Sequence, residues 1–326
     1  MSTKIEWCKN KDGGQGKTWN PVTGCTKISP GCQNCYAERM AKRLRGRCGY
    51  DAENPFKVTL HPDRLEEPMR WRKPSMVFVC SMGDLFHDDV PFDFIDRVFK
   101  RINGSPQHDF LILTKRTERM REYFARSMKF LCAACQGTGC SYCLDHGYQN
   151  WEMKPYSNVW LGVTAENQEM ADKRIPILLQ IPAAVRFVSV EPMLGPVDLL
   201  SEDYLGGCIN CEICLDSPEK CINRVNNLKL DWVICGGETG PDARPMHPDW
   251  VRGLRDQCQS AGVPFFFKQW GEYIHASQTP DNMTNYDPEY FYDREWPPGF
   301  ARVGKKIAGR LLDGCEWNEM PKVAQP

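Results

Sequence analysis

The chain has 326 residues, with 41 Lys and Arg against 42 Asp and Glu, and 17 cysteines. A net charge of −1 gives no global reason to expect a nucleic-acid or membrane partner, and the length suits two average domains or one large α/β barrel. No apolar run approaches the roughly 20 residues of a membrane span, and residues 1–7 lack a signal-peptide core, so we expect a cytoplasmic protein without a membrane partner.

The first notable motif in the chain is Cys25-x6-Cys32-x2-Cys35, followed by an amphipathic run over 37–44 that predicts a helix. Three thiolates leave one position of a metal centre free, whereas a closed structural zinc site takes four protein ligands. Two alternatives stay open here. One is a 4Fe-4S cluster with an exposed iron, and the other is a zinc site completed by Cys8, Cys48 or a histidine.

Short apolar runs rich in β-branched and aromatic residues then alternate with helix-like segments. With a short strand before Cys25, the alternation gives about seven strands and predicts an α/β fold with a parallel sheet. We expect a partial or complete (β/α) barrel, formed as a single domain over 1–326. The predicted strands are 76–80, 110–114, 159–163, 185–190, 232–235 and 263–267, and the predicted helices are 91–102, 117–126, 168–180 and 248–261.

Two cysteine-rich insertions, 131–157 and 201–229, interrupt this alternation, and 271–326 forms a C-terminal extension that ends in a predicted short helix over 308–312. In a reducing compartment, C-x2-C spacing indicates metal ligands rather than disulfides. The first insertion resembles the zinc repeats of the DnaJ chaperone family and predicts zinc; the second suits zinc or a second 4Fe-4S cluster equally well. The two predicted ligand sets are Cys132, Cys135, Cys140 and Cys143, and Cys208, Cys211, Cys214 and Cys221.

Polar or glycine residues follow every predicted strand. Because ligands of parallel α/β proteins bind at the carboxyl ends of the strands, these residues are the candidates for a site. Any one of them is more simply a helix cap or a surface residue, but the set as a whole indicates ligand binding. The set is Ser81, Gly83, Asp84, Lys115, Arg116, Thr164, Glu166, Asn167, Ser189, Glu191, Gly236, Gly237, Glu238, Lys268, Gln269 and Trp270.

Two weaker signals concern the substrate. Basic residues at 42–47 and at 305–310 could contact phosphates, with Trp270, Tyr273, Tyr290 or Tyr292 available for base stacking, although such runs are usually solvated helix faces. Cys80 and Cys235 each stand at a strand end and could donate hydrogen to a substrate radical, although buried core cysteine is more common.

A set of specific motifs, spread nearly end to end, resembles the three-Cys-motif proteins of phages and bacteria, which are regarded as divergent radical SAM-like proteins. The usual radical SAM spacing is C-x3-C-x2-C, and this chain departs from it with six residues between the first two cysteines. The motifs are Trp19-Asn-Pro-Val-Thr-Gly-Cys25, Ser29-Pro-Gly-Cys32-Gln-Asn-Cys35-Tyr-Ala-Glu38, Phe78-Val-Cys-Ser-Met-Gly-Asp84-Leu-Phe-His87, Leu113-Thr-Lys-Arg116, Trp160-Leu-Gly-Val163, Phe187-Val-Ser-Val-Glu-Pro192, Gly236-Gly-Glu238 and Phe267-Lys-Gln-Trp270.

The resemblance implies reductive cleavage of S-adenosylmethionine (SAM) to methionine and a 5'-deoxyadenosyl radical. Cys25, Cys32 and Cys35 would hold the 4Fe-4S cluster, with Tyr36 beside it. The methionine amino group would bind either at Ser81, Gly83 and Asp84 or at Gly236, Gly237 and Glu238. Ser189 and Glu191 would bind the ribose, and Lys115 or Arg116 the methionine carboxylate.

Two further expectations concern partners. An electron donor such as flavodoxin or ferredoxin would supply the reducing electron, and the substrate would be a nucleic acid or a modified nucleotide. The alternative function is a zinc-stapled nucleic-acid-binding or accessory protein without redox chemistry. The vacant fourth ligand position at Cys25, Cys32 and Cys35, together with the polar strand ends, favours the enzyme.

Overall fold

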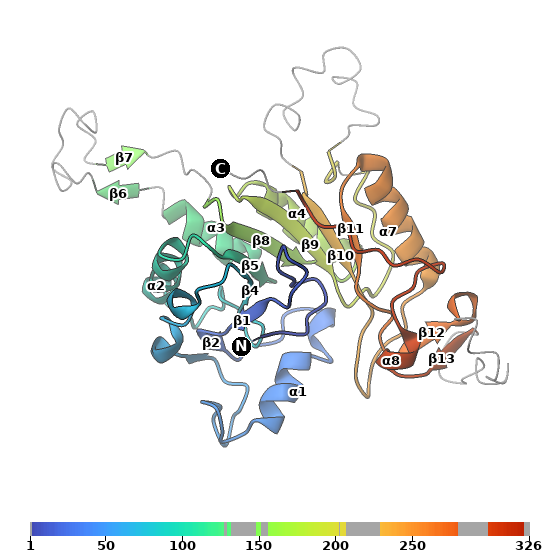
Figure 1. The fold of residues 1–326 in the computed structure, drawn as a ribbon, viewed down its shortest axis with the longest axis horizontal. Coiled ribbons are helices and arrows are strands. Elements are labelled where there is room, and N and C mark those ends of the chain that lie inside the picture. Colours follow the sequence, from blue (N-terminus) through green and yellow to red (C-terminus); the bar gives the residue numbers. More distant parts are fainter. Residues whose placement is uncertain are drawn as a thin grey trace, which may run out of the picture.

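A seven-stranded parallel sheet organises the chain in the computed structural model, which describes residues 2–126, 129–131, 148–150, 156–201, 203–206, 229–279 and 299–322 (Figure 1). Each strand of this sheet pairs with the one that precedes it and the one that follows it along the chain, and β1 and β11 form open edges. The predicted α/β fold is therefore confirmed as a partial barrel. Its strands are β1 (Lys17–Trp19), β4 (Met76–Val79), β5 (Asp109–Thr114), β8 (Val159–Thr164), β9 (Val185–Val190), β10 (Trp232–Cys235) and β11 (Phe265–Phe267).

Four helices connect successive strands and lie on the outer face of the sheet: α2 (Phe92–Asn103), α3 (Thr117–Arg126), α4 (Gln168–Leu179) and α7 (Pro248–Ala261). They match the four predicted helices to within a residue, because their ends carry strong local signals. The Asn167 side chain accepts a hydrogen bond from the Met170 amide at 3.0 Å, and so caps α4. Pro248 opens α7, and Gly262, at φ 64°, closes it.

The remaining elements are short. Two antiparallel pairs join β2 (Val22–Thr23) to β3 (Thr59–Leu60) and β12 (Tyr273–His275) to β13 (Phe300–Arg302), and a third joins β6 (Lys129–Leu131) to β7 (Tyr148–Asn150). Helix α1 (Tyr36–Arg43) follows the cysteine motif, and α8 (Lys305–Ala308) lies near the C-terminus. The prediction of a helix over 308–312 was wrong, because Gly309 at φ 66° ends α8 there. The other elements are the 3-10 turns η1 (Pro30–Cys32), η2 (Pro62–Arg64), η3 (Pro68–Arg70) and η5 (Ala276–Gln278).

Several predictions fall outside the described residues. These are the eight cysteines of the two insertions, Cys132, Cys135, Cys140, Cys143, Cys208, Cys211, Cys214 and Cys221, and the stacking candidates Tyr290 and Tyr292. Their metal-binding and stacking roles stay predictions. Within the described ranges, no helix combines the length and the apolar character that a membrane span needs.

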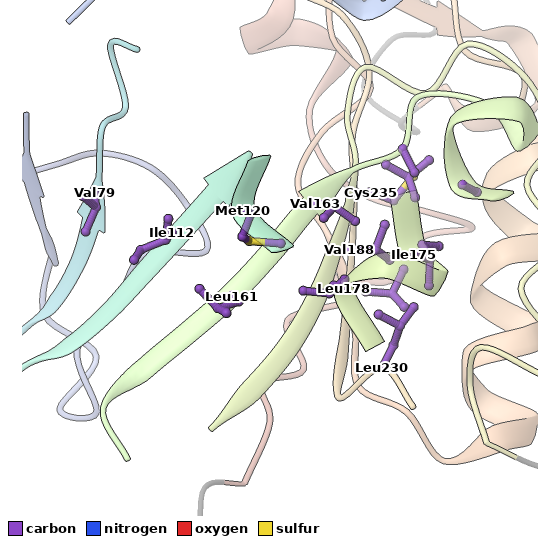
Figure 2. Close-up of a cluster of buried hydrophobic side chains, with 14 of the residues drawn as sticks. Val79, Ile112, Met120, Leu161, Val163, Ile175, Leu178, Val188, Leu230 and Cys235 are labelled. Atoms are coloured by element: carbon purple, nitrogen blue, oxygen red, sulfur yellow. The ribbon is translucent and has the colours of Figure 1, made fainter. Parts of the chain in front are cut away.

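The larger core lies between the sheet and the helices. Alternate strand residues, among them Ile112, Leu161 and Val188, point outward to meet Met120 of α3 and Ile175 of α4 (Figure 2). This alternation follows from the two-residue period of a strand, which sends successive side chains to opposite faces. Burial of this face holds the helices to the sheet.

The opposite, concave face carries a second and smaller core. Trp160, Trp232 and Phe187 line it, and the N-terminal segment inserts Trp7 among them. The Trp7 ring lies 4.8 Å from the Phe78 ring and 6.3 Å from that of Trp232. This apolar packing fills the concave face, and the polar residues at the carboxyl ends of the strands lie at the cavity next to it.

Candidate active site

A cavity of about 1320 Å³ opens at the carboxyl ends of the strands. It is lined by all three cysteines of the first motif and by predicted residues from β4, β5, β8, β9, β10 and β11, so one site collects residues that are far apart in the sequence. Those lining residues are Cys25, Cys32, Cys35, Tyr36, Ser81, Gly83, Asp84, Lys115, Arg116, Thr164, Ser189, Glu191, Gly237, Glu238, Lys268 and Gln269. Gly236 lies directly behind Glu191 and Lys268.

The predicted strand-end residues Asn167 and Trp270 do not line this cavity. Asn167 caps α4, and the buried Trp270 ring donates from Nε1 to the Leu311 carbonyl at 2.8 Å. Both are structural, in line with the simpler interpretation of an isolated strand-end residue.

The cysteine loop, defined as residues 25–35, crosses the mouth of the half-barrel between β2 and α1. Gly24, at φ 85°, starts it, and a side chain there would collide with the Lys57 carbonyl oxygen at 2.1 Å. The η1 turn brings Cys32 back toward the mouth, and α1 begins directly after Cys35. All three thiols are partly buried.

Two adjacent cations at the end of β5 each reach a different thiol of this loop. Arg116 Nη1 lies 3.2 Å from Cys25 Sγ, and Lys115 Nζ lies 3.6 Å from Cys32 Sγ. Arg116 Nη2 also donates to the Thr26 carbonyl at 3.1 Å and to the Thr26 hydroxyl at 2.8 Å. The end of β5 therefore both positions the loop and places positive charge beside its sulfur atoms.

The two thiols differ in acidity. Burial and the nearby Asp84 carboxylate raise the pKa of Cys25 to about 11, in spite of Arg116. Burial also acts to raise the pKa of Cys32, but the Lys115 ammonium and hydrogen bonds from the Ile28 and Ser29 region hold it below the ordinary value. Cys32 is thus the more readily formed thiolate of the two.

Glu166, which follows β8, connects the cysteine loop to the sheet through hydrogen bonds. Its side chain is fully buried; Oε1 accepts from the Gly31 amide at 3.0 Å, and Oε2 accepts from Arg174 Nη1 at 2.8 Å. Burial would raise the pKa of Glu166, but Lys115, Ser29 and Arg174 together lower it. A side chain at position 31 would lie 3.0 Å from this carboxylate, so Gly31 permits the close approach.

Glu238, which follows β10, makes a second attachment. Its carboxylate pairs with Arg244 at 2.7 Å and accepts from Asn34 Nδ2 at 3.1 Å. Arg244 Nη2 in turn donates to the Pro30 carbonyl at 3.1 Å. The stretch between Cys25 and Cys35 is therefore held by residues from β5, β8 and β10 at once.

The two candidate sites for the methionine amino group differ in their remaining hydrogen-bonding capacity. Asp84 is buried and accepts from Thr114, from the amides of Phe86 and Lys115, and from Arg116. Among the described residues, Glu238 Oε1 accepts from Arg244 alone, and Glu238 lines the cavity. A carboxylate oxygen can accept two hydrogen bonds, so Glu238 keeps capacity that Asp84 has used.

A further ion pair remains on the concave side. Lys268 Nζ lies 2.6 Å from Glu191 Oε1, and both side chains line the cavity. Burial would lower the pKa of Lys268, but Glu191 raises it, so the ammonium keeps its charge. Ser189 of β9 is buried and lines the same cavity as Glu191, which follows that strand.

The alternatives for a fourth ligand and for a hydrogen donor can now be judged by position. Cys8 bonds to the Lys17 and Met76 carbonyls at the amino ends of β1 and β4, so it faces away from the cysteine loop. Cys235 packs in the outer core against Met193, so it cannot reach a ligand in the cavity. Cys80 and Cys48 both line the cavity. No group of three or more His, Cys, Asp or Glu side chains in the described part of the chain is gathered closely enough for one metal ion.

Sequence reasoning missed Asn34, Arg174 and Arg244. None of them directly follows a strand. Arg174 bonds to Glu166, 8 positions away, and Arg244 bonds to Glu238, 6 positions away. Asn34 bonds to Glu238 across 204 positions. Asn34 stands within the cysteine motif, but no local pattern in the sequence indicates its partner or the partners of the two arginines.

The fold and the site define an α/β half-barrel protein with a cysteine-lined mouth. The chain belongs to the family described as "Protein of unknown function (DUF5131)", which matches residues 2–321. A comparison with curated proteins gives no match.

Among solved structures, the chain is similar to spore photoproduct lyase. One variant has a TM-score of 0.35 and 9% identity, over 74% of this chain and 60% of its own. Another, with bound AdoMet and dinucleoside spore photoproduct, has a TM-score of 0.36 and 10% identity, over 78% of this chain and 63% of its own. This chain thus spans less than two thirds of the length of these structures, and a likeness this distant transfers neither a reaction nor a substrate.

Proposed function

We propose that this protein is a radical SAM-type iron–sulfur enzyme of the three-Cys-motif kind, with Cys25, Cys32 and Cys35 as ligands of a 4Fe-4S cluster. The observation that carries the proposal is the position of the three thiols. They lie on one loop, over a cavity at the carboxyl ends of a parallel half-barrel, and two of them face cations.

The residues present suit a cluster better than a single ion. A structural zinc ion takes four protein ligands, whereas a cluster held by three thiolates leaves one iron without a protein ligand. The three thiols line one cavity, and Cys8, a candidate fourth ligand, faces away from the cysteine loop. The cations supplied by Lys115 and Arg116 would offset the negative charge of a thiolate-bound cluster.

When bound and reduced by a donor such as flavodoxin or ferredoxin, the cluster supplies one electron that breaks a carbon–sulfur bond of SAM and releases methionine and the 5'-deoxyadenosyl radical. The chain's own part is to bind and orient SAM. Glu238 Oε1 has capacity for the methionine ammonium, and Lys115 can bind the carboxylate. Ser189 and Glu191 would bind ribose hydroxyls, and these two residues and Tyr36 all line the cavity.

The test is anaerobic purification, followed by determination of iron, sulfide and zinc and by an absorbance spectrum. Dithionite and SAM are then added, and 5'-deoxyadenosine is measured by chromatography. We expect a broad band near 400 nm, an approximate position for iron–sulfur charge transfer, and 5'-deoxyadenosine from the native protein. Cys32→Ser should lose both signals, and Cys315→Ser, at an exposed cysteine outside the cavity, should keep them.

Zinc at the first motif with no such band would contradict the proposal and support a zinc-stapled accessory protein. A cluster without 5'-deoxyadenosine would contradict SAM cleavage. The same metal determinations on Cys140→Ser and Cys214→Ser test the two cysteine-rich insertions. We expect Cys140→Ser to lose zinc, and Cys214→Ser to lose either zinc or the iron of a second 4Fe-4S cluster.

A further inference from the structure

Exposed basic side chains stand at the end of α1 and just beyond it, next to Leu44 and Cys48, which line the cavity. They are Lys42, Arg43, Arg45 and Arg47. Lys42 pairs with Glu38 at 2.8 Å, whereas the Arg47 guanidinium donates to the Arg43 carbonyl at 3.2 Å. No acidic side chain of the described residues forms an ion pair with any of these three arginines. Positive charge therefore gathers at the end of α1, in a chain whose net charge is −1.

The cavity connects this basic segment to a second one. Its lining runs from Leu44 and Cys48, beside the arginines, to Lys4 and Lys305. Lys305 pairs with Glu6 at 3.0 Å, whereas the exposed Lys4 and Lys306 form no ion pair within the described ranges. Figure 1 shows α1 standing apart from the helices that cover the sheet, so its charged end is open to a large partner.

Aromatic side chains also belong to the cavity, which measures about 1320 Å³. Tyr36, with 58% of its surface exposed, stands at the rim, and Tyr50 and Phe56 line the part next to the arginines. Asp63 and Glu67 also line that part, so the wall is mixed in charge and the net excess of positive charge lies at the mouth.

We propose that the basic mouth, defined as Lys4, Arg43, Arg45, Arg47 and Lys306, binds the phosphate backbone of a single-stranded nucleic acid, with one of its bases inserted into the cavity. This deepens the proposed function and rests on it for the role of the cavity as a reaction site.

The chemistry favours this partner over an acidic peptide or an anionic lipid surface. The planar guanidinium group of arginine can donate two parallel hydrogen bonds to one phosphate, and three of the five cations are arginines. Aromatic rings next to a basic groove are the combination that stacks bases while the backbone is held by charge. A base of a single strand enters a cavity without the unpairing cost that a duplex imposes, which favours the single strand.

The experiment measures anisotropy of a fluorescein-labelled single-stranded oligonucleotide of mixed sequence, as DNA and as RNA, against the full-length protein between about 50 and 200 mM salt. The variant R43Q/R45Q/R47Q removes the arginines. The matched control, R70Q/R72Q/K73Q, removes three exposed cations that precede β4, at the amino end of the sheet. Circular dichroism of both variants shows whether each is folded.

We expect the native protein and the control to bind alike, and the arginine variant to bind at least about tenfold more weakly. Its slope of log affinity against log salt should be smaller by about 2, since each lost phosphate contact in a single strand is worth about 0.7. Equal binding by all three proteins, or loss in the control alone, would overturn the proposal. So would arginine-dependent binding of vesicles containing phosphatidylserine or of polyglutamate, with no binding of the oligonucleotide.

The two proposals fail separately. 5'-Deoxyadenosine formed in the absence of oligonucleotide reports SAM cleavage alone, and we expect R43Q/R45Q/R47Q to form it at the native rate. Oligonucleotide binding without SAM cleavage would refute the proposed function and leave the basic mouth standing. SAM cleavage without oligonucleotide binding would refute the basic mouth and leave the proposed function standing.

Discussion

Lys115 and Arg116 show how two neighbouring residues can act on different sulfur atoms. They follow β5 directly, and their side chains reach Cys32 at 3.6 Å and Cys25 at 3.2 Å. Arg116 shares its charge with Asp84, whose carboxylate also acts on Cys25, whereas Lys115 acts on Cys32. The consequence is a difference in acidity between two cysteines that belong to the same loop.

We predict that Cys32 in the metal-free, reduced protein reacts with iodoacetamide several-fold faster than Cys25 at about pH 8. The lower pKa of Cys32 gives it the larger thiolate fraction, and the thiolate is the reactive form. Peptide mass spectrometry after a short exposure measures both rates. Lys115→Gln should slow the alkylation of Cys32 and leave the alkylation rate of Cys25 nearly unchanged. Equal slowing at both cysteines would show that the lysine acts through the structure of the loop instead of through its charge.

At the scale of elements, the contacts of the six residues between Cys25 and Cys32 account for a spacing longer than the usual three. This stretch includes Pro30 and Gly31, which both contact residues beyond the strands. Gly31 bonds to Glu166 beyond β8, and Pro30 bonds to Arg244 beyond β10. The longer loop therefore spans the mouth and attaches to both sides of it.

We predict that Glu166→Ala lowers the free energy of unfolding by about 3–5 kcal/mol, because it leaves Arg174 as a buried, unpaired charge. Urea unfolding of the metal-free protein measures it. The matched control is Glu118→Ala, which breaks the exposed pair with Arg121 on α3 and should cost less than about 1 kcal/mol. Similar losses in the two variants would mean that Arg174 finds another partner.

At the scale of the whole molecule, the open half-barrel is completed by segments far apart in the chain. Trp7 fills the concave face at the amino ends of the strands, and Glu6 pairs with Lys305 from the C-terminal region. The same N-terminal segment lines the floor of the cavity. Residues 3–7 and Lys305, which are far apart in the chain, thus both line one cavity.

Three buried histidines, His61, His87 and His108, make the stability of the whole fold depend on pH. Burial lowers the pKa of each, so the folded protein keeps them neutral. Below the unfolded pKa of about 6.5, the unfolded chain takes up protons that the folded chain does not, and the free energy of unfolding falls. Above that pH their contribution is fully present.

We predict a lower urea midpoint at about pH 5.5 than at about pH 7.5, with a loss of up to about 1.4 kcal/mol per pH unit for each histidine. His61→Gln, which can still bond to Thr23, should show a shallower decline. A flat or rising profile across this window would contradict the assignment of neutral histidines.

The sequence by itself determined the α/β fold with a parallel sheet, because the features that specify it are local, and it left a partial and a complete barrel open. Strands such as 159–164 show as short apolar runs, the helices between them carry caps at Asn167 and Gly262, and the polar residues at strand ends follow from the alternation. It also identified the cysteine loop, whose spacing is visible in the chain. These signals need no knowledge of which segments meet.

Only the tertiary structure decided how the site is assembled. The sequence leaves the choice between Asp84 and Glu238 open, yet Asp84 accepts from both Thr114 and Arg116, whereas Glu238 Oε1 accepts from Arg244 alone among the described residues. Asn34 holds Glu238 across 204 positions. Hydrogen bonds and ion pairs act over a few ångströms, so which charges are used up and which remain for a ligand depends on distances that the folded chain alone sets.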